Sequence, residues 1–359
     1  MIVWEQPLPG DGVGGIAADD QLVVVGCRSL DDLEDQFFGF DARSGEMLWQ
    51  VAYLAEGRLD YGNSPRATPL ITDDFVYLCG AFGHVTCVDR ELGIELWQRN
   101  VAIDFGTPEL EWGLAGSPIL VDDKLILQPG GAQGSIVALD PLSGETLWAT
   151  GTAPPGHSSL IVAAPGGRRQ VIGYDKLTLG GWDVATGARL WTFAPPVNGD
   201  FNVPTPLLVD DSLFVTTENN GSRLYAFAKD GTLNPQPLAS DRQLCPDSHT
   251  PVIAADRVFG VSEGMHCLNA RTLEPIWRST VPDVGDYASI IASDTRVLVL
   301  TIHSELLLFD ATADQPTLLS RLALTEDGQE TLSHPACSQR KLYVRVGGRL
   351  LCLDLEATE

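Results

Sequence analysis

Seven aromatic, basic, histidine or amide side chains stand where polar segments lead into short apolar runs. They are Tyr61, Arg66, Trp112, His157, Asn202, His249 and Tyr287. Arginine together with tyrosine and tryptophan is the composition of ligand pockets and of the hot spots of protein interfaces. We therefore predict that these side chains bind a ligand, and we assign no catalytic residue and no metal ligand.

A second set of polar side chains follows the next connection between apolar runs. It contains Glu218, Asn219, Glu263, His266 and His303. The most acidic segment, residues 29–36, offers the oxygen ligands that calcium prefers, but it lacks the alternating aspartates and glycine of a defined calcium loop. We interpret this segment as a solvated loop. The signatures G-x-S-x-G, G-x-x-x-x-G-K-[ST] and H-E-x-x-H are absent from the sequence.

A repeat in the sequence indicates the scaffold that positions these residues. An Asp or Asn is followed eight positions later by a Trp in five copies: Asp41 and Trp49, Asp89 and Trp97, Asp140 and Trp148, Asp183 and Trp191, and Asn269 and Trp277. In four copies a glycine stands four positions before the Trp: Gly45, Gly93, Gly144 and Gly187. Self-similarity at a fixed spacing is typical of proteins built from repeated structural units.

Each repeat contains short runs of Val, Ile, Leu, Tyr and Phe separated by Asp-Asp, Gly-Gly or Ser-Gly turns. Four strands in about 40–50 residues are typical of a propeller blade. We predict an all-β, eight-bladed β-propeller of four-stranded antiparallel blades, with residues 1–359 forming a single domain. The N-terminal strand around Trp4 is expected to complete the last blade, which lacks its own Trp. The fifth copy is expected to have a degraded outer strand, and the seventh has Leu318 in place of the Trp.

The Trp, the glycine and the Asp each have an expected structural role. The Trp can cover the neighbouring blade and donate its indole N–H to a backbone carbonyl there. The glycine suits a turn that needs positive φ, and the Asp can accept hydrogen bonds from turn amides. Function is then expected in the segments that do not repeat. The long loops are predicted at residues 51–63, 101–111, 194–202 and 238–248, and we expect the seven binding residues to converge on one funnel.

Composition and charge exclude several classes of function. A net charge of −25, from 48 acidic and 23 basic residues, repels nucleic acid and anionic lipid surfaces. No apolar run approaches the ~18 residues that indicate a transmembrane segment. The seven cysteines include no adjacent pair and no C-x-x-C, so zinc and thioredoxin-like sites are unsupported. No signal peptide is visible at the N-terminus, and we expect a monomer.

The repeat resembles the tryptophan-docking motif of the pyrroloquinoline quinone (PQQ)-like propellers, A/L-x-D-x-x-T/S-G-x-x-x-W. The segment from Ala138 to Trp148 carries this pattern in full. Residues 60–69 and 112–118 are similar to segments of bacterial envelope proteins with PQQ-like repeats. This family contains quinoprotein alcohol dehydrogenases, which bind PQQ and calcium, and the non-enzymatic outer-membrane assembly lipoprotein BamB.

The resemblance implies two alternative functions. The first is a non-catalytic binding or assembly scaffold of the bacterial cell envelope or periplasm, which presents its funnel to a protein or a glycan-like small molecule. The second is a PQQ- or metal-dependent oxidoreductase acting on an alcohol or sugar. In the quinoprotein family the cofactor lies between a Trp and a disulfide of adjacent cysteines, and this sequence has no such pair. We therefore favour the scaffold and expect no cofactor, with PQQ and Ca²⁺ as the alternative and a cytoplasmic location left open.

Overall fold

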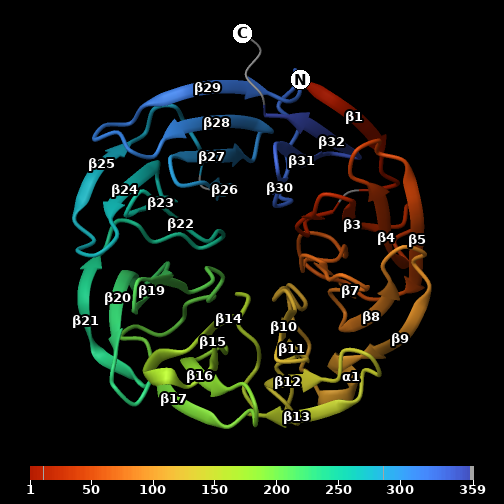
Figure 1. Cartoon of the computed structure of the whole chain (residues 1–359), viewed down its shortest axis with the longest axis horizontal. Coiled ribbons are helices and arrows are strands. Elements are labelled where there is room, and N and C mark those ends of the chain that lie inside the picture. The colour runs from red at the N-terminus through yellow and green to blue at the C-terminus, as the bar shows by residue number, and fades with distance from the viewer. Residues whose placement is uncertain (11, 286, 356–359) are drawn as a thin grey trace. The chain divides into compact units, whose positions relative to one another are not determined.

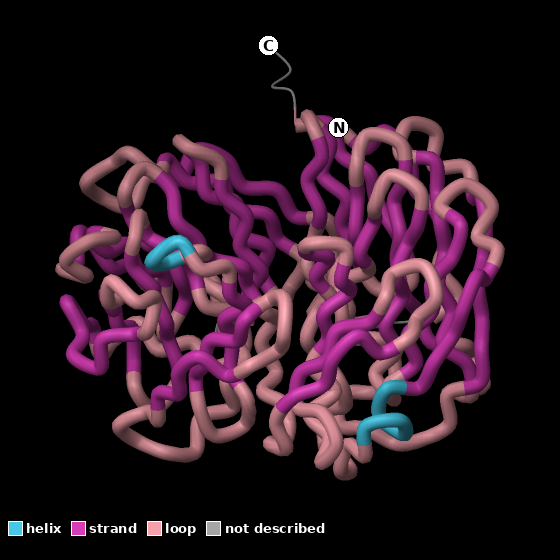
Figure 2. The backbone as a smooth tube through the Cα atoms, turned by 60° about the horizontal axis from the view of Figure 1, so that its bottom comes forward, coloured by secondary structure: helices cyan, strands magenta, loops and turns pink. Residues whose placement is uncertain are grey.

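The computed structural model describes residues 1–10, 12–285 and 287–355. Strands dominate it, and its two helical segments, α1 (Val101–Phe105) and η1 (Pro165–Gly167), are short (Figure 2). The described strands form eight separate four-stranded antiparallel sheets, which are the blades of a propeller (Figure 1). The predicted all-β fold with eight four-stranded blades is therefore confirmed.

Two compact units of four blades each make up the chain. Unit 1 contains Met1–Thr152 and the segment from Gln329 onward, and unit 2 contains Ala153–Gly328. The prediction that residues 1–359 form a single domain stays a prediction.

Unit 1 contains blades 8, 1, 2 and 3. Blade 8 consists of β30 (Ala336–Ser338), β31 (Lys341–Val346), β32 (Arg349–Asp354) and β1 (Ile2–Pro7). Blade 1 consists of β2 (Ala17–Ala18), β3 (Leu22–Arg28), β4 (Glu34–Asp41) and β5 (Met47–Leu54). Blade 2 consists of β6 (Leu70–Ile71), β7 (Phe75–Cys79), β8 (His84–Asp89) and β9 (Glu95–Asn100). Blade 3 consists of β10 (Ile119–Val121), β11 (Lys124–Leu127), β12 (Ile136–Leu139) and β13 (Thr146–Thr150).

Unit 2 contains blades 4 to 7. Blade 4 consists of β14 (Ile161–Ala163), β15 (Gln170–Tyr174), β16 (Leu179–Asp183) and β17 (Arg189–Phe193). Blade 5 consists of β18 (Leu207–Val209), β19 (Ser212–Thr217), β20 (Gly221–Phe227) and β21 (Leu233–Asp241). Blade 6 consists of β22 (Val252–Ala254), β23 (Arg257–Val261), β24 (Met265–Asn269) and β25 (Pro275–Ser279). Blade 7 consists of β26 (Ala288–Ala292), β27 (Arg296–Thr301), β28 (Glu305–Asp310) and β29 (Leu318–Ala323).

The N-terminal strand completes the last blade, as predicted. β1 pairs antiparallel with β32, with Trp4 opposite Cys352 and Gln6 opposite Leu350 (Figure 1). Blade 8 is thus built from both ends of the described chain, and the outer edge of β32 is covered by β1.

Burial explains why the inner strands read as continuous apolar runs. Every residue of β3 is buried, because both faces of an inner strand pack against neighbouring blades, whereas the outer strand β5 alternates with solvent. Tight turns connect the strands. Asp122 and Asp123 have φ values of 48° and 55° and join β10 to β11, which is the geometry of a two-residue hairpin turn.

The structure corrects the extent of several loops. The loop predicted at residues 51–63 begins only after β5 ends at Leu54, and the one predicted at residues 101–111 begins with α1. The loop predicted at residues 238–248 is shortened because β21 continues to Asp241. The outer strand of the fifth blade is also not degraded. It is nine residues long, and what that blade lacks is the Trp.

Three Trp side chains of unit 1 contact the next blade in the same way. The indole N–H of Trp49 donates to Arg90 O at 2.9 Å, and that of Trp97 donates to Pro141 O at 3.0 Å. Trp4, carried by β1, donates to Ala42 O at 3.3 Å. All three rings are more than 90% buried. The predicted role of the Trp as a clasp between blades is therefore confirmed at these positions.

The recurring spacing of glycine before Trp has a steric cause within unit 1. Gly45, Gly93 and Gly144 have φ between 64° and 75°. A Cβ atom on Gly144 would lie 2.8 Å from the ring of Trp97, and one on Gly45 would lie 2.6 Å from the ring of Trp4. Each glycine thus receives the Trp of the preceding blade, because only hydrogen leaves room for the ring.

The aspartate of the repeat holds the same turn from inside. Asp140 Oδ1 accepts the backbone N–H groups of Leu142 at 2.9 Å and Ser143 at 2.8 Å. The hydrogen bonds from Ser143 and Leu142 lower the pKa of Asp140, because they stabilise its charged form. Asp41, Asp89 and Asn269 accept turn amides in the same way.

The junction between blades 5 and 6 uses a different solution. Blade 5 has no outer Trp, and the matching turn of blade 6 has Leu273 where other copies have glycine. Leu273 is 1% exposed and shares an apolar cluster with Phe214 and Leu224 of blade 5. It keeps the positive φ of the turn, at 54°. The leucine side chain therefore occupies the place that the incoming Trp takes elsewhere.

We expect Trp97→Ala to lower the free energy of unfolding by about 3–5 kcal/mol, because it removes a large buried ring and its hydrogen bond. Trp97→Phe, the matched control, keeps a ring on Gly144 and loses the N–H, so a smaller loss is expected. Chemical denaturation monitored by circular dichroism measures both. A loss below about 1 kcal/mol for Trp97→Ala would contradict the clasp.

Leu273→Gly restores the common residue of the repeat, yet we expect it to destabilise the protein by about 1–4 kcal/mol. Loss of a buried leucine outweighs the relief of positive φ, which is worth roughly 1 kcal/mol. Leu92→Gly, at an exposed position in the turn of blade 2, is the control and is expected to have a smaller effect. Equal effects of the two substitutions in denaturation curves would show that Leu273 fills no void.

Candidate functional site

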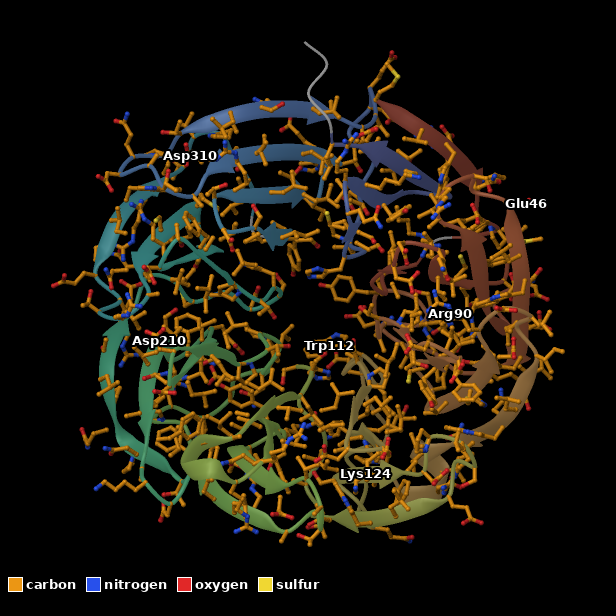
Figure 3. All side chains as sticks on the ribbon, viewed as in Figure 1. Glu46, Arg90, Trp112, Lys124, Asp210 and Asp310 are labelled. Carbon is orange, nitrogen blue, oxygen red and sulfur yellow. The ribbon has the colours of Figure 1, made fainter. Side chains whose placement is uncertain are left out.

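The first candidate surface consists of two loops of unit 1, which we call the paired loops. They are residues 55–69, between β5 and β6, and residues 106–118, between α1 and β10. Asp60 N donates to Glu111 O at 2.9 Å, so backbone atoms join the two loops directly. Trp112 lies at the inner side of its blade, away from the outer strand β13 (Figure 3).

Arg66 holds the paired loops together. Its Nε donates to Trp112 O at 2.5 Å, its Nη1 to Ser64 O at 3.1 Å, and its Nη2 to Gly62 O at 3.0 Å and to Asp60 O. All these acceptors are backbone carbonyls. Burial lowers the pKa of Arg66 below its usual value, although Asp60 and Asp35 act in the opposite direction. Arg66 thus fixes the shape of the loops.

Tyr61 is presented by this rigid loop. It is 60% exposed, has a φ of 59°, and its backbone N–H donates to Asp60 Oδ1 at 3.0 Å. The structure therefore brings three predicted binding residues, Tyr61, Arg66 and Trp112, onto one pair of loops. Binding by these residues stays a prediction.

An acidic cleft of about 480 Å³ opens between the paired loops. Its lining residues are Arg58, Leu59, Asp60, Glu109, Leu110 and Glu111. The volume falls within the ~300–1,000 Å³ of small-molecule sites. Three carboxylates against one arginine favour a positively charged group.

A network of hydrogen bonds and an ion pair connects the first of the paired loops to residues 28–32. Asn63 accepts from Leu59 N at 2.8 Å and donates to Asp32 Oδ2 at 2.7 Å. Asp32 is paired with Arg28 at 2.8 Å, and Arg28 Nη2 donates to Ala55 O at 2.7 Å. Sequence reasoning missed Asn63 and Arg28. The available signal was Arg28 itself, a basic residue immediately before the acidic segment.

The acidic segment is tied into this network by two of its carboxylates. Arg28 Nη1 donates to Asp35 Oδ1 at 2.8 Å, and the Asp35 side chain is fully buried. Burial raises the pKa of Asp35 to about 6, while Arg28, the Tyr53 hydroxyl and Arg66 act to lower it. In residues 1–10, 12–285 and 287–355 no group of three or more His, Cys, Asp or Glu side chains is placed to hold a metal ion.

The predicted residues of unit 2 make internal contacts. Asn202 is buried, donates through Nδ2 to Asp175 O and Lys176 O at 3.2 Å, and receives His157 N on its backbone carbonyl at 3.2 Å. His249 is 2% exposed and accepts Val261 N on Nε2 at 3.0 Å. Asn202 and His157 are thus brought together, and Asn202 and His249 satisfy backbone groups. Tyr287 is 38% exposed and precedes β26.

The second set of polar residues also lies in unit 2. Glu218 accepts Phe201 N, and burial raises the pKa of Glu218, with Asp200 and Asp247 adding to the effect. His303 follows β27. Glu263 and His266 line a separate cleft of blade 6.

Four-stranded blades joined by a Trp on a glycine turn define the PQQ-like β-propeller class. The family model that matches is described as outer membrane protein assembly factor BamB, and it covers residues 1–129 and 132–357. The chain belongs to this family.

Individual relatives are distant. BamB of Kangiella koreensis is 24% identical over 217 residues, which is 57% of this chain and 48% of that protein. A 1-butanol dehydrogenase (cytochrome c) of Thauera butanivorans is 26% identical over 169 residues, or 44% of this chain and 23% of the relative. The matches thus span about half and about a quarter of those proteins. The crystal structure of BamB from Moraxella catarrhalis has the same fold, with a TM-score of 0.68 and 18% identity, covering 100% of this chain and 98% of that one.

No helix in the described part of the chain is long and apolar enough to span a membrane.

Titration of Asp35 predicts a pH dependence of stability. Its pKa is raised in the folded state, from 3.8 to about 6, so between these values the folded protein keeps a proton that the unfolded chain releases. The free energy of unfolding therefore falls as the pH rises through this window, by up to about 3 kcal/mol from this group, and its contribution is constant above it. We expect Asp35→Asn to flatten the profile between pH 4 and 6.

Denaturation at several pH values measures this slope. Asp211→Asn, at an exposed position, is the matched control and should keep the profile of the original protein. A slope unchanged by Asp35→Asn would contradict the assignment to Asp35.

Proposed function

We propose that the chain is a non-catalytic binding or assembly scaffold of the bacterial cell envelope, and that a protein partner docks on the paired loops. The observation that carries the proposal is the presentation of exposed Tyr61 by a loop that Arg66 fixes through four backbone carbonyls. A rigid aromatic side chain loses little conformational entropy on binding, which favours its use as a hot spot. The BamB family supports a scaffold role.

The acidic cleft suggests the chemistry of the partner. Asp60, Glu109 and Glu111 outnumber Arg58, so a lysine or arginine side chain of the partner is the complementary group. The net charge of −25 attracts a basic partner over a longer range and makes association sensitive to salt. A glycan ligand, the other occupant predicted from the sequence, lacks this positive charge.

An oxidoreductase function remains the second candidate, because one relative is a 1-butanol dehydrogenase. The residues present do not fit the PQQ site of quinoprotein enzymes. All seven cysteines are free thiols, and no two are adjacent in the sequence, so the disulfide that covers the cofactor in those enzymes has no counterpart. Incubation with PQQ and Ca²⁺ followed by spectroscopy and dye reduction tests this candidate, and a bound-cofactor spectrum with substrate-dependent reduction would favour it over the scaffold.

Site-specific photo-crosslinking tests the docking surface. With a photoreactive residue at position 61, we expect a discrete protein adduct in cells, and its yield should fall when Glu109 and Glu111 are changed to Gln. The same residue at Leu142, which is 64% exposed on the outer turn of blade 3, is the control and should give no such adduct. Identical adducts at both positions, or none at position 61, would contradict docking on the paired loops.

A further inference from the structure

Unit 2 contains a polar cleft of about 590 Å³, which we call the Arg278 cleft. Three segments form it: the loop after β21, the turn between β23 and β24, and the end of β25. Its charged and polar lining includes Arg242, Cys245, Ser262, Glu263, His266 and Arg278. The volume is well within the ~300–1,000 Å³ of small-molecule sites.

Arg278 is held in one orientation before any ligand arrives. Its Nε donates to His266 Nδ1 at 3.1 Å, and its Nη2 donates to Asp241 Oδ2 at 2.5 Å. Asp241 is fixed in turn, because its Oδ1 accepts Gln243 N at 2.9 Å and Leu244 N at 2.7 Å. In the described part of the chain these two are the hydrogen bonds of the Arg278 side chain, and its Nη1 donors face no protein acceptor. A preorganised guanidinium with free donors is suited to a carboxylate.

His266 positions Arg278, and both of its ring nitrogens form hydrogen bonds within the protein. Because Nδ1 accepts from Arg278, the proton is on Nε2, which donates to Ser262 O at 2.7 Å. Burial lowers the pKa of His266, and the charge of Arg278 lowers it further, while the bond to Ser262 O opposes both. The imidazole is therefore neutral with a fixed tautomer. This arrangement excludes it as a metal ligand or a general base without loss of the Arg278 contact.

The charges around the cleft indicate a ligand that carries one negative and one positive group. Arg278 and Asp241 compensate each other, which leaves Arg242 and Glu263, both exposed, as an opposite pair on the rim. The lining contains no Trp, Tyr or Phe, so the stacking platform common in sugar sites is missing from it. Arg278 can bind a carboxylate and Glu263 can bind an ammonium group, so a small molecule that carries both groups fits the cleft.

We propose that the Arg278 cleft binds a free amino acid or a short peptide, with the ligand carboxylate on Arg278 and Arg242 and its ammonium group on Glu263. The residues of this cleft belong to unit 2 and the paired loops belong to unit 1. Ligand binding in the cleft can therefore be tested independently of partner docking on the paired loops.

Calorimetric titration with L-alanyl-L-alanine tests the proposal on the full chain. We expect saturable binding of L-alanyl-L-alanine. N-acetyl-L-alanine, which lacks the ammonium group, should bind more weakly, and L-alaninamide, which lacks the carboxylate, should not bind. No saturable binding of L-alanyl-L-alanine up to about 10 mM would overturn it. Binding of inorganic phosphate as tightly as the dipeptide would also overturn it, because the cleft would then be a general anion site.

Substitutions locate the binding. Arg278→Lys keeps the charge but loses the planar fork, so we expect at least an about 10-fold weaker affinity. The matched control is Arg271→Lys, because Arg271 forms exposed ion pairs with Asp210 and Asp256 of neighbouring turns and does not line the cleft. Unchanged affinity in Arg278→Lys would overturn the assignment.

Glu263→Gln provides a test that is insensitive to folding, since this side chain is exposed. It should weaken binding of L-alanyl-L-alanine and leave N-acetyl-L-alanine unaffected. Equal weakening of both probes would overturn the ammonium contact and with it the zwitterionic ligand.

Discussion

The contact on which the blades of unit 1 depend is a tryptophan ring lying on a glycine turn of the next blade. The ring fills the space that a Cβ would need, its N–H satisfies a turn carbonyl, and the aspartate of the turn holds the carbonyl-bearing segment in place. One local sequence thus provides the space for the ring, the acceptor for its N–H and the hydrogen bonds that hold the turn. Because each copy reaches only its neighbour, the contact can be lost in one blade if that junction is repacked, as Leu273 shows in unit 2.

This locality is why the fold could be predicted from the sequence. The spacing from Asp41 to Trp49 recurs, and each element of it acts within one turn and the blade beside it. The wrong prediction for the outer strand of blade 5 also has a physical reason. β21 is a nine-residue strand, with two irregularities in its pairing, although most of its residues are exposed to solvent, because an outer strand packs through one face only. Backbone hydrogen bonding to β20, which leaves no mark in the sequence, is enough to define it.

The binding residues were harder to predict, because polar side chains before inner strands have two uses. Arg66 bonds to carbonyls of both paired loops, and Asn202 bonds to carbonyls of the turn between β15 and β16. His249 receives a buried amide. The carbonyl of Asp175 and the amide of Val261 are buried, and the side chains of Asn202 and His249 satisfy them. A sequence records the residue type but not which partner it meets. Tyr61 is different only because its loop carries it outward, and Arg278 was missed because its neighbours His266 and Asp241 are distant in sequence.

The pairing of β1 with β32 has a consequence for biogenesis. β1 is synthesised well before its partner β32, so among the described sheets blade 8 has the longest sequence separation between paired strands. Blades 1 to 3 can each form from contiguous sequence as they emerge, whereas β1 stays unpaired until β32 has been made. Contacts of long sequence separation form slowly, and an unpaired strand edge invites association with other chains. The period between the synthesis of β1 and that of β32 is therefore when the protein is most exposed to aggregation and has most to gain from a chaperone that covers a single strand.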